Sequence, residues 1–194
     1  MEKNIILCGV GGQGTVLASK LIAGAAMEKN IPVMSAETIG MAQKGGSVFS
    51  HIRLGDDLYT PMIPLGGADI IIGFEPAETV RMLPYLKKGG NVIVNSCATK
   101  PVTAVLSDTG YDGTEMIAYL QAKVEHLTVV DCNRASEEIG SGKVVNMVLL
   151  GAALETGELP VTKDDIKALI QQRVKPAFLE MNYRALDYVE NRGK

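Results

Sequence analysis

Short apolar runs separated by helix-like stretches recur along this chain. Residues 4–8 (NIILC), 68–74 (ADIIIGF) and 89–96 (GGNVIVNS) have the length of a strand and are largely apolar on both faces. Strands of this kind are expected in a parallel sheet that helices cover on both sides. Further strands are predicted at residues 32–36, 48–54 and 126–132. Helices are predicted at residues 15–29, 76–86, 114–123, 143–156, 162–174 and 176–191.

The order of these elements predicts one α/β domain over residues 1–194. Alternating strands and helices followed by C-terminal helices are typical of a doubly wound, Rossmann-like, mostly parallel sheet. An inserted hairpin is expected at residues 48–63, with its turn at residues 55–57. The alternation along its first arm puts Phe49, His51 and Arg53 on one face of the strand.

Composition excludes several functions. The formal net charge is −3, the pI is about 5.5 and the sequence contains no basic run, so a nucleic-acid partner is not expected. No stretch reaches the ~18 consecutive apolar residues of a membrane span, and the chain starts directly with a strand pattern. We therefore expect no membrane association, no signal peptide and a cytoplasmic location.

The three cysteines, Cys8, Cys97 and Cys132, lie far apart in the sequence, each at the end of a predicted strand. No C-x-x-C pair is present, so neither an iron–sulfur cluster nor a structural zinc site is encoded in this chain alone. We expect buried, reduced thiols, with a reactive role as the alternative.

A glycine-rich loop lies between the first strand and the first helix. Gly9, Gly11 and Gly14 fit the pattern G-x-G-x-x-G, and Gly12 adds a fourth glycine before Thr15. Glycine permits a tight turn and a close approach of the backbone, and the N–H groups at a helix start favour an anion.

The dinucleotide fingerprint also requires an acidic residue roughly 20 positions further on, to bind the ribose. Lys29 and Asn30 occupy that distance, and Glu37 comes later. Only ~40–50 helical residues follow the sheet, too few for a substrate domain. Both observations disfavour a small NAD(P)- or flavin-dependent reductase, which we keep as an alternative. A nucleotide-sensing module that uses the glycine loop is another alternative.

The segment ETIGMAQKGGSVFSHIRLG, residues 37–55, is long, polar and rich in glycine. Such a segment inside a compact domain is usually functional. Lys44, His51 and Arg53 supply charge beside the glycine loop, and we consider them candidate binding residues. The alternative is a solvated hairpin.

Three further polar residues have a structural and a functional interpretation. Glu75 and Glu78 lie at the start of the helix predicted at residues 76–86, where carboxylates complement the helix dipole; a role at an active site is the alternative. Asn146 lies in the apolar run VVNMVLLGAAL and needs a hydrogen-bond partner, either within the domain or on another subunit.

Five segments occur in a recognisable order: GVGGQGTVLASKLI, SAETIGMAQKGGSVFSHIRLG, TPMIPLGGADIIIGFEPAETVR, GGNVIVN and KVVNMVLLGAAL. Together they closely resemble the gamma-type subunit or domain of the 2-oxoacid:ferredoxin oxidoreductases, from about residue 4 to residue 154. The short chain and the third segment most resemble the small subunits of the indolepyruvate-oxidising branch. Branches that act on pyruvate, 2-oxoisovalerate or 2-oxoglutarate share these segments.

The resemblance implies a heteromeric oxidoreductase. Such an enzyme decarboxylates an aryl 2-oxoacid on thiamine diphosphate, passes electrons through [4Fe-4S] clusters to ferredoxin and releases an acyl-coenzyme A. It implies that thiamine and clusters belong to a larger alpha subunit, and that this chain binds no cofactor alone and contributes no catalytic residue.

Coenzyme A is the co-substrate that the resemblance associates with this type of subunit. Its phosphates suit Gly9, Gly11, Gly12, Gly14 and Thr15, with Lys44, His51 and Arg53 adding charge or contacting the partner. Arginine is common at the position of Lys44 in the family, and lysine lacks its bidentate fork.

Overall fold

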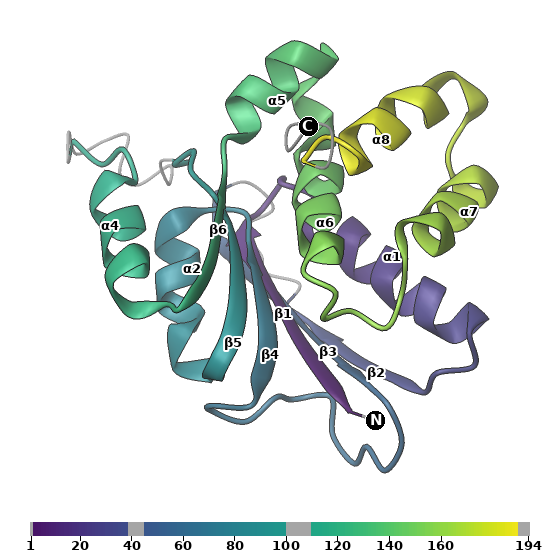
Figure 1. The fold of residues 1–194 in the computed structure, drawn as a ribbon, viewed down its shortest axis with the longest axis horizontal. Helices are drawn as coiled ribbons and strands as arrows, with labels where there is room; N and C mark the ends of the chain where they lie inside the picture. Colours follow the sequence, from purple (N-terminus) through teal and green to yellow (C-terminus); the bar gives the residue numbers. More distant parts are fainter. Residues whose placement is uncertain (1, 39–44, 100–109, 190–194) are drawn as a thin grey trace.

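The computed structural model describes residues 2–38, 45–99 and 110–189 and has a layered α/β fold (Figure 1). One six-stranded sheet forms its centre, in the order β2-β3-β1-β4-β5-β6. The strands are β1 (Lys3–Val10), β2 (Val33–Glu37), β3 (Ser47–Leu54), β4 (Ala68–Gly73), β5 (Leu86–Asn95) and β6 (His126–Val130). Only β3 runs against the others, pairing antiparallel with β1 and with β2, so the predicted mostly parallel sheet is confirmed.

Helices cover both faces of this sheet, as the apolar strands predict (Figure 1). One face packs against α1 (Thr15–Glu28) and α6 (Val145–Glu155), and α7 (Lys163–Arg173) and α8 (Leu179–Leu186) pack on these two helices within the same apolar cluster. The other face packs against α2 (Pro76–Met82) and α4 (Thr114–Lys123). Three short 3₁₀ turns are also described: η1 (Leu83–Tyr85), η2 (Gly142–Val144) and η3 (Pro176–Phe178).

The hydrophobic core divides between these two faces. Ile5, Leu7 and Ile72 are fully buried toward α1 and α6, while Ile6 and Ile71 are fully buried toward α2 and α4. Successive residues of a strand point to opposite faces, so a strand between two helical layers must be apolar at every position. This is why the runs NIILC and ADIIIG have no polar alternation.

The structure corrects two sequence predictions. The antiparallel hairpin is formed by β2 and β3, and residues 58–63 form no second arm after the turn at Gly55. The helix α5 (Cys132–Ile139) was not predicted, and Cys132 begins this helix instead of ending a strand. Asp131 caps α5 by accepting a hydrogen bond from the Arg134 N–H at 3.0 Å.

Within the described ranges, no helix has both the length and the apolar character required to cross a bilayer. The cysteine thiols are free: Cys8 and Cys132 are buried, and Cys97 is partly exposed.

Candidate functional site

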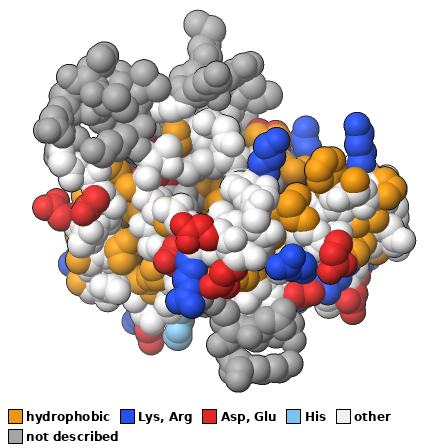
Figure 2. All heavy atoms as spheres, turned by 90° about the horizontal axis from the view of Figure 1, so that it is seen from above, with side chains coloured by type: hydrophobic (Ala, Val, Ile, Leu, Met, Phe, Trp, Pro, Cys, Tyr) orange, Lys and Arg blue, Asp and Glu red, His pale blue; other side chains and the backbone are white. Residues whose placement is uncertain are grey.

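The glycine loop lies where β1 ends and α1 begins, at the carboxyl end of the parallel strands (Figure 1). Ligands of doubly wound proteins bind outside this end of the sheet. Figure 2 shows this end of the molecule, where acidic and basic side chains both lie on the surface. The candidate site is therefore defined by its backbone and not by a surface of one charge.

Two glycines of the loop are required by close packing. A Cβ added at Gly9 would lie 2.7 Å from the Phe74 Cβ, and one at Gly14 would lie 2.9 Å from the Asn146 Nδ2. Gly14 also has φ of +85°, a conformation that L side chains rarely adopt. The glycines thus allow the loop to lie directly against β4 and α6.

Gln13 holds the loop in place. Its Oε1 accepts a hydrogen bond from the Val10 N–H at 2.7 Å, and its Nε2 donates to the Phe74 carbonyl at 3.1 Å. The same nitrogen donates to the Thr99 hydroxyl at 3.1 Å. Sequence reasoning missed this residue; the only available signal was a long amide side chain inside a glycine motif.

The loop offers fewer donors than the sequence suggested. The Gly11 N–H donates to the Gly46 carbonyl at 2.9 Å and the Gln13 N–H to the Val10 carbonyl at 3.2 Å, so both groups are already used. The first turn of α1, starting at Thr15, has no side-chain cap and no acidic residue. Because helix N-termini carry partial positive charge, this turn is the part of the loop that suits an anion.

Two buried carboxylates lie at the neighbouring end of β4. Glu75 is the N-cap of α2, where its Oε2 accepts from the Glu78 N–H at 3.0 Å and its Oε1 accepts from the Tyr111 hydroxyl. Glu78 accepts from the Ser47 hydroxyl at 2.6 Å. Burial, followed by the contact with Glu75, raises the pKa of Tyr111. The helix-start role predicted for Glu75 is confirmed by its capping bond.

Of the charged residues predicted to line the loop, the two that the structure describes, His51 and Arg53, lie elsewhere. Lys44 lies outside the described residues. His51 is fully buried in the middle of β3, opposite Ile6 of β1. Its ring packs between Phe49 and Tyr85, at centroid distances of 5.4 and 5.5 Å.

His51 accepts a hydrogen bond at Nδ1 from the Ile63 N–H at 3.0 Å. Burial lowers the pKa of this imidazole from its ordinary value of 6.5. Because Nδ1 accepts a hydrogen bond, the neutral ring carries its proton on Nε2. This buried Nε2 has no hydrogen-bond partner among the residues that the structure describes. His51 thus anchors the segment after β3 and does not reach the glycine loop.

Arg53 lies at the opposite end of the sheet from the loop, paired in register with Asn4 near the start of β1. It donates to the Asn4 Oδ1 and to the Thr60 carbonyl, both at 3.0 Å, and forms an ion pair with Glu2. The structure therefore brings together Gly9, Gly11, Gly12, Gly14 and Thr15, but places His51 and Arg53 elsewhere.

Asn146 has a local partner, as one of the two interpretations predicted. Its Oδ1 accepts from the Met147 N–H at 3.0 Å, and its amide nitrogen lies against Gly14. The first turn of α6 therefore packs directly against the N-terminus of α1 at Gly14.

Sheet, covering helices and loop together define a doubly wound α/β domain with a glycine-rich loop at the end of its first strand. The chain belongs to the pyruvate ferredoxin/flavodoxin oxidoreductase family, whose model matches residues 4–189. This match confirms the resemblance read from the sequence segments.

Individual relatives agree with this assignment. The chain is 36% identical over 188 residues to the indolepyruvate oxidoreductase subunit IorB of Pyrococcus horikoshii, covering 96% of this chain and 93% of that protein. It is 26% identical to the pyruvate/ketoisovalerate oxidoreductases common subunit gamma of Thermococcus kodakarensis, covering 95% of this chain and 93% of that protein. A solved pyruvate oxidoreductase subunit, PORC of Thermotoga maritima, has a TM-score of 0.64 and 26% identity, covering 95% of this chain and 93% of the other.

Proposed function

We propose that this chain is the small, non-autonomous subunit of an indolepyruvate:ferredoxin oxidoreductase. The observation that carries the proposal is the match at 36% identity, along nearly the full length of both chains, to an indolepyruvate oxidoreductase subunit. The match to a common gamma subunit of pyruvate and ketoisovalerate oxidoreductases has lower identity, 26%. A gamma subunit of such an enzyme is accordingly the second candidate.

The proposed complex decarboxylates an aryl 2-oxoacid to an acyl-coenzyme A in the cytoplasm, with ferredoxin as electron acceptor. Thiamine diphosphate and the [4Fe-4S] clusters belong to the larger subunit. The cysteines of this chain do not fit a cluster, which needs several thiolates close together. Cys8 and Cys132 are buried on different elements, and desolvation raises the pKa of both thiols.

Coenzyme A is the proposed ligand of the glycine loop. Its phosphates suit the first turn of α1, and no described atom lies within 4 Å of a Cβ added at Gly12, which has φ of +103°. An anion held there gains from the helix dipole, and the loop needs no rearrangement because Gln13 already fixes it. The chain's contribution is positioning and exclusion of water beside the partner's reactive centre.

A dinucleotide reductase is less well supported. In the dinucleotide fold the acidic residue at the end of the second strand lies beside the first strand. Here β3 separates β2 from β1, and Glu37 at the end of β2 accepts a hydrogen bond from the Ser19 hydroxyl at 3.1 Å. The carboxylate is therefore displaced by one strand, about 5 Å, from the position that binds a ribose.

Reconstitution tests the proposal. The purified chain, the larger subunit purified separately, and the two mixed are each supplied with indolepyruvate, coenzyme A and oxidised ferredoxin. We expect ferredoxin reduction and acyl-coenzyme A formation only in the mixture, and faster turnover of indolepyruvate than of pyruvate, 2-oxoisovalerate or 2-oxoglutarate. Turnover by the isolated chain, or an unchanged rate when it is omitted, would disprove the assignment.

A further inference from the structure

The segment between β3 and β4 exposes an unusual number of large apolar side chains. Tyr59 is 91% exposed, Leu65 is 70% exposed and Met62 is 47% exposed, all within seven residues. Single exposed hydrophobic residues are common, but several on one short segment indicate a surface that another molecule covers.

This segment is held in one conformation by bonds to the rest of the domain. The Gly66 N–H donates to the Pro84 carbonyl at 3.0 Å, and the Gly67 N–H donates to the Pro64 carbonyl at 3.1 Å. Ile63 is buried and is bonded through its N–H to the imidazole of His51. The exposed side chains are therefore presented on a fixed backbone, which lowers the entropic cost of covering them.

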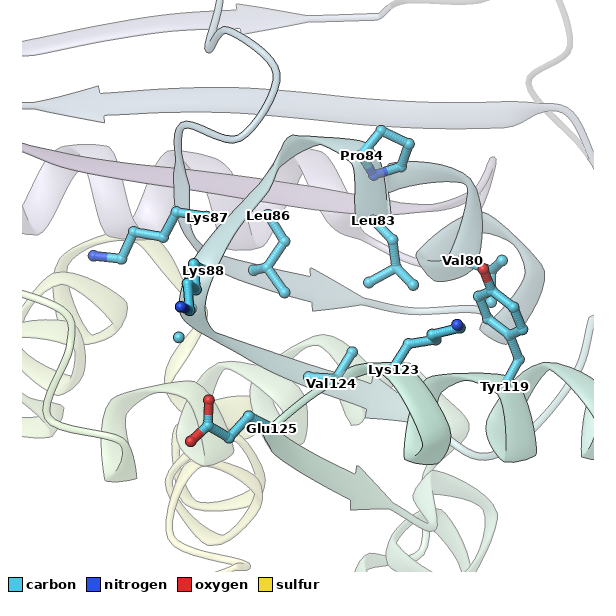
Figure 3. Close-up of a pocket in the computed structure, with 12 residues that line it drawn as sticks. Val80, Leu83, Pro84, Leu86, Lys87, Lys88, Tyr119, Lys123, Val124 and Glu125 are labelled. Carbon is cyan, nitrogen blue, oxygen red and sulfur yellow. The ribbon is translucent and has the colours of Figure 1, made fainter.

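A groove adjoins this segment at Pro84 (Figure 3). It has a volume of about 500 Å³, and Leu83, Leu86 and Val124 contribute its apolar lining. Figure 3 shows Lys88 toward one end of the groove and Lys123 with Tyr119 toward the other. The Lys123 ammonium lies 6.0 Å from the centre of the Tyr119 ring.

The charge of the groove differs from that of the chain. Lys87, Lys88 and Lys123 line it together with a single carboxylate, Glu125. Lys87 is already paired with Asp69, whereas no hydrogen bond or ion pair to a carboxylate is found for Lys88 or Lys123 in the described structure. In a chain of net charge −3 this is a local basic surface with an apolar centre.

We infer that Leu65 and this groove, which meet at the Gly66–Pro84 hydrogen bond, form a docking surface for the larger subunit, which inserts a segment whose apolar side chains are flanked by carboxylates. The inference rests on the proposed function for the identity of the partner. Apolar side chains fill the groove, and carboxylates meet Lys88 and Lys123 at its rim. The surface lies at the opposite end of the sheet from the glycine loop, so it is a second contact with the larger subunit, in addition to the contact that the proposed function assigns to the loop.

A second copy of this chain fits the surface less well. In a symmetric dimer the same patch, with three lysines and one carboxylate, occurs on both partners, so two surfaces of positive charge would be brought together. Like charges brought together in an interface disfavour association.

Binding measurements on surface variants test the inference. The affinity of the larger subunit for the wild-type chain is compared with its affinity for Leu65→Glu and for the double variant Lys88→Glu, Lys123→Glu. We expect each change to weaken binding by ~10-fold or more, and the double variant to reduce the salt dependence of the affinity. Met27→Glu is the matched control, because Met27 is 65% exposed at the end of α1, away from the groove.

The outcomes separate this inference from the proposed function. If the wild-type chain binds and activates the larger subunit but the variants bind equally well, the docking surface is wrong and the function stands. If the wild-type chain neither binds nor activates it, the proposed function fails. A change in the oligomeric state of the isolated variants, without loss of subunit binding, would assign the surface to a second copy and overturn the inference.

Discussion

His51 illustrates what a strand pattern reveals about a residue and what it omits. The alternation along residues 48–54 assigned Phe49, His51 and Arg53 to one face, and the structure has His51 packed with Phe49 on that face. The alternation does not show whether other elements cover that face of the strand. In the structure β3 lies inside the sheet, between β1 and β2. His51, for which the sequence left a binding role and a solvated hairpin open, is fully buried.

Burial of this imidazole makes stability depend on pH. The folded pKa of His51 is lowered, so between that value and the unfolded pKa near 6.5 the unfolded chain binds more protons. The contribution of the neutral imidazole to the free energy of unfolding is therefore fully present above pH 6.5, and it is lost as the pH falls toward the folded pKa. His51→Asn keeps an acceptor for the Ile63 N–H but cannot titrate, so we expect this loss to disappear in the variant.

Urea unfolding at pH 7.5 and pH 5 measures the effect. At pH 7.5 the variant should be less stable by about 1–3 kcal/mol, because a ring is removed from the core. The chain has one other histidine, the exposed His126, which makes His126→Asn the natural control. Equal pH dependence in wild type and His51→Asn would show that another group titrates.

Most helices and strands follow from periodicity and length. The strongly apolar strands β1, β4 and β5 were located to within a few residues, because burial on both faces leaves an unbroken apolar run. The helix α5 was missed because CNRASEEI is short and mainly polar. The antiparallel partners of β3 were missed because pairing depends on segments far apart in the sequence.

The packing of α6 against α8 depends on one glycine. A Cβ added at Gly151 would lie 2.0 Å from the Leu186 carbonyl oxygen, which is backbone and has to move. We therefore expect Gly151→Ala to lower the free energy of unfolding by about 3 kcal/mol, although alanine is the better helix former. Gly142→Ala is the control, since no atom of the described residues lies within 4 Å of its added Cβ. Thermal or urea unfolding measures the stability of both variants. Equal stabilities of Gly151→Ala and Gly142→Ala would rule out a tight α6–α8 contact.

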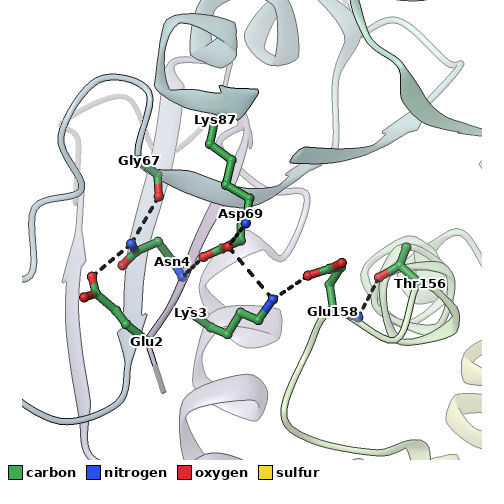
Figure 4. A network of polar contacts seen from close by, with 8 residues as sticks. All are labelled: Glu2, Lys3, Asn4, Gly67, Asp69, Lys87, Thr156 and Glu158. Carbon is green, nitrogen blue, oxygen red and sulfur yellow. Dashed lines mark hydrogen bonds and ion pairs between the residues drawn. The ribbon is translucent and has the colours of Figure 1, made fainter. Parts of the chain in front are cut away.

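Segments distant in the sequence are joined by a polar network at the amino ends of the strands (Figure 4). Asp69, at 7% exposure, accepts from the Asn4 N–H at 2.7 Å and from the Lys87 ammonium. The Lys3 Nζ lies 3.9 Å from the Asp69 Oδ1, and the same ammonium forms an ion pair with Glu158. The hydrogen bond to Asp69 raises the pKa of Lys87. No sequence motif indicated this network, because its members come from separate strands and loops.

Asp69→Asn tests the contribution of this network. The variant removes the negative charge that two lysines share, so we expect a loss of about 2 kcal/mol and a return of the Lys87 pKa toward its ordinary value. Glu158→Gln, at a more exposed carboxylate, should cost less. Denaturant unfolding and NMR titration of the lysine side chains measure the two quantities. An unchanged Lys87 pKa in Asp69→Asn would contradict the pairing.

The position of β3 has a consequence for synthesis of the chain. The strands β1, β2 and β3 find all their mutual partners within the first 54 residues, and α1 packs on the same unit. Contacts between residues close in sequence form early, since little loop entropy is lost. We expect this N-terminal unit to assemble on the ribosome while the segment from β4 onward is still being made, and β4 then to add to the free edge of β1.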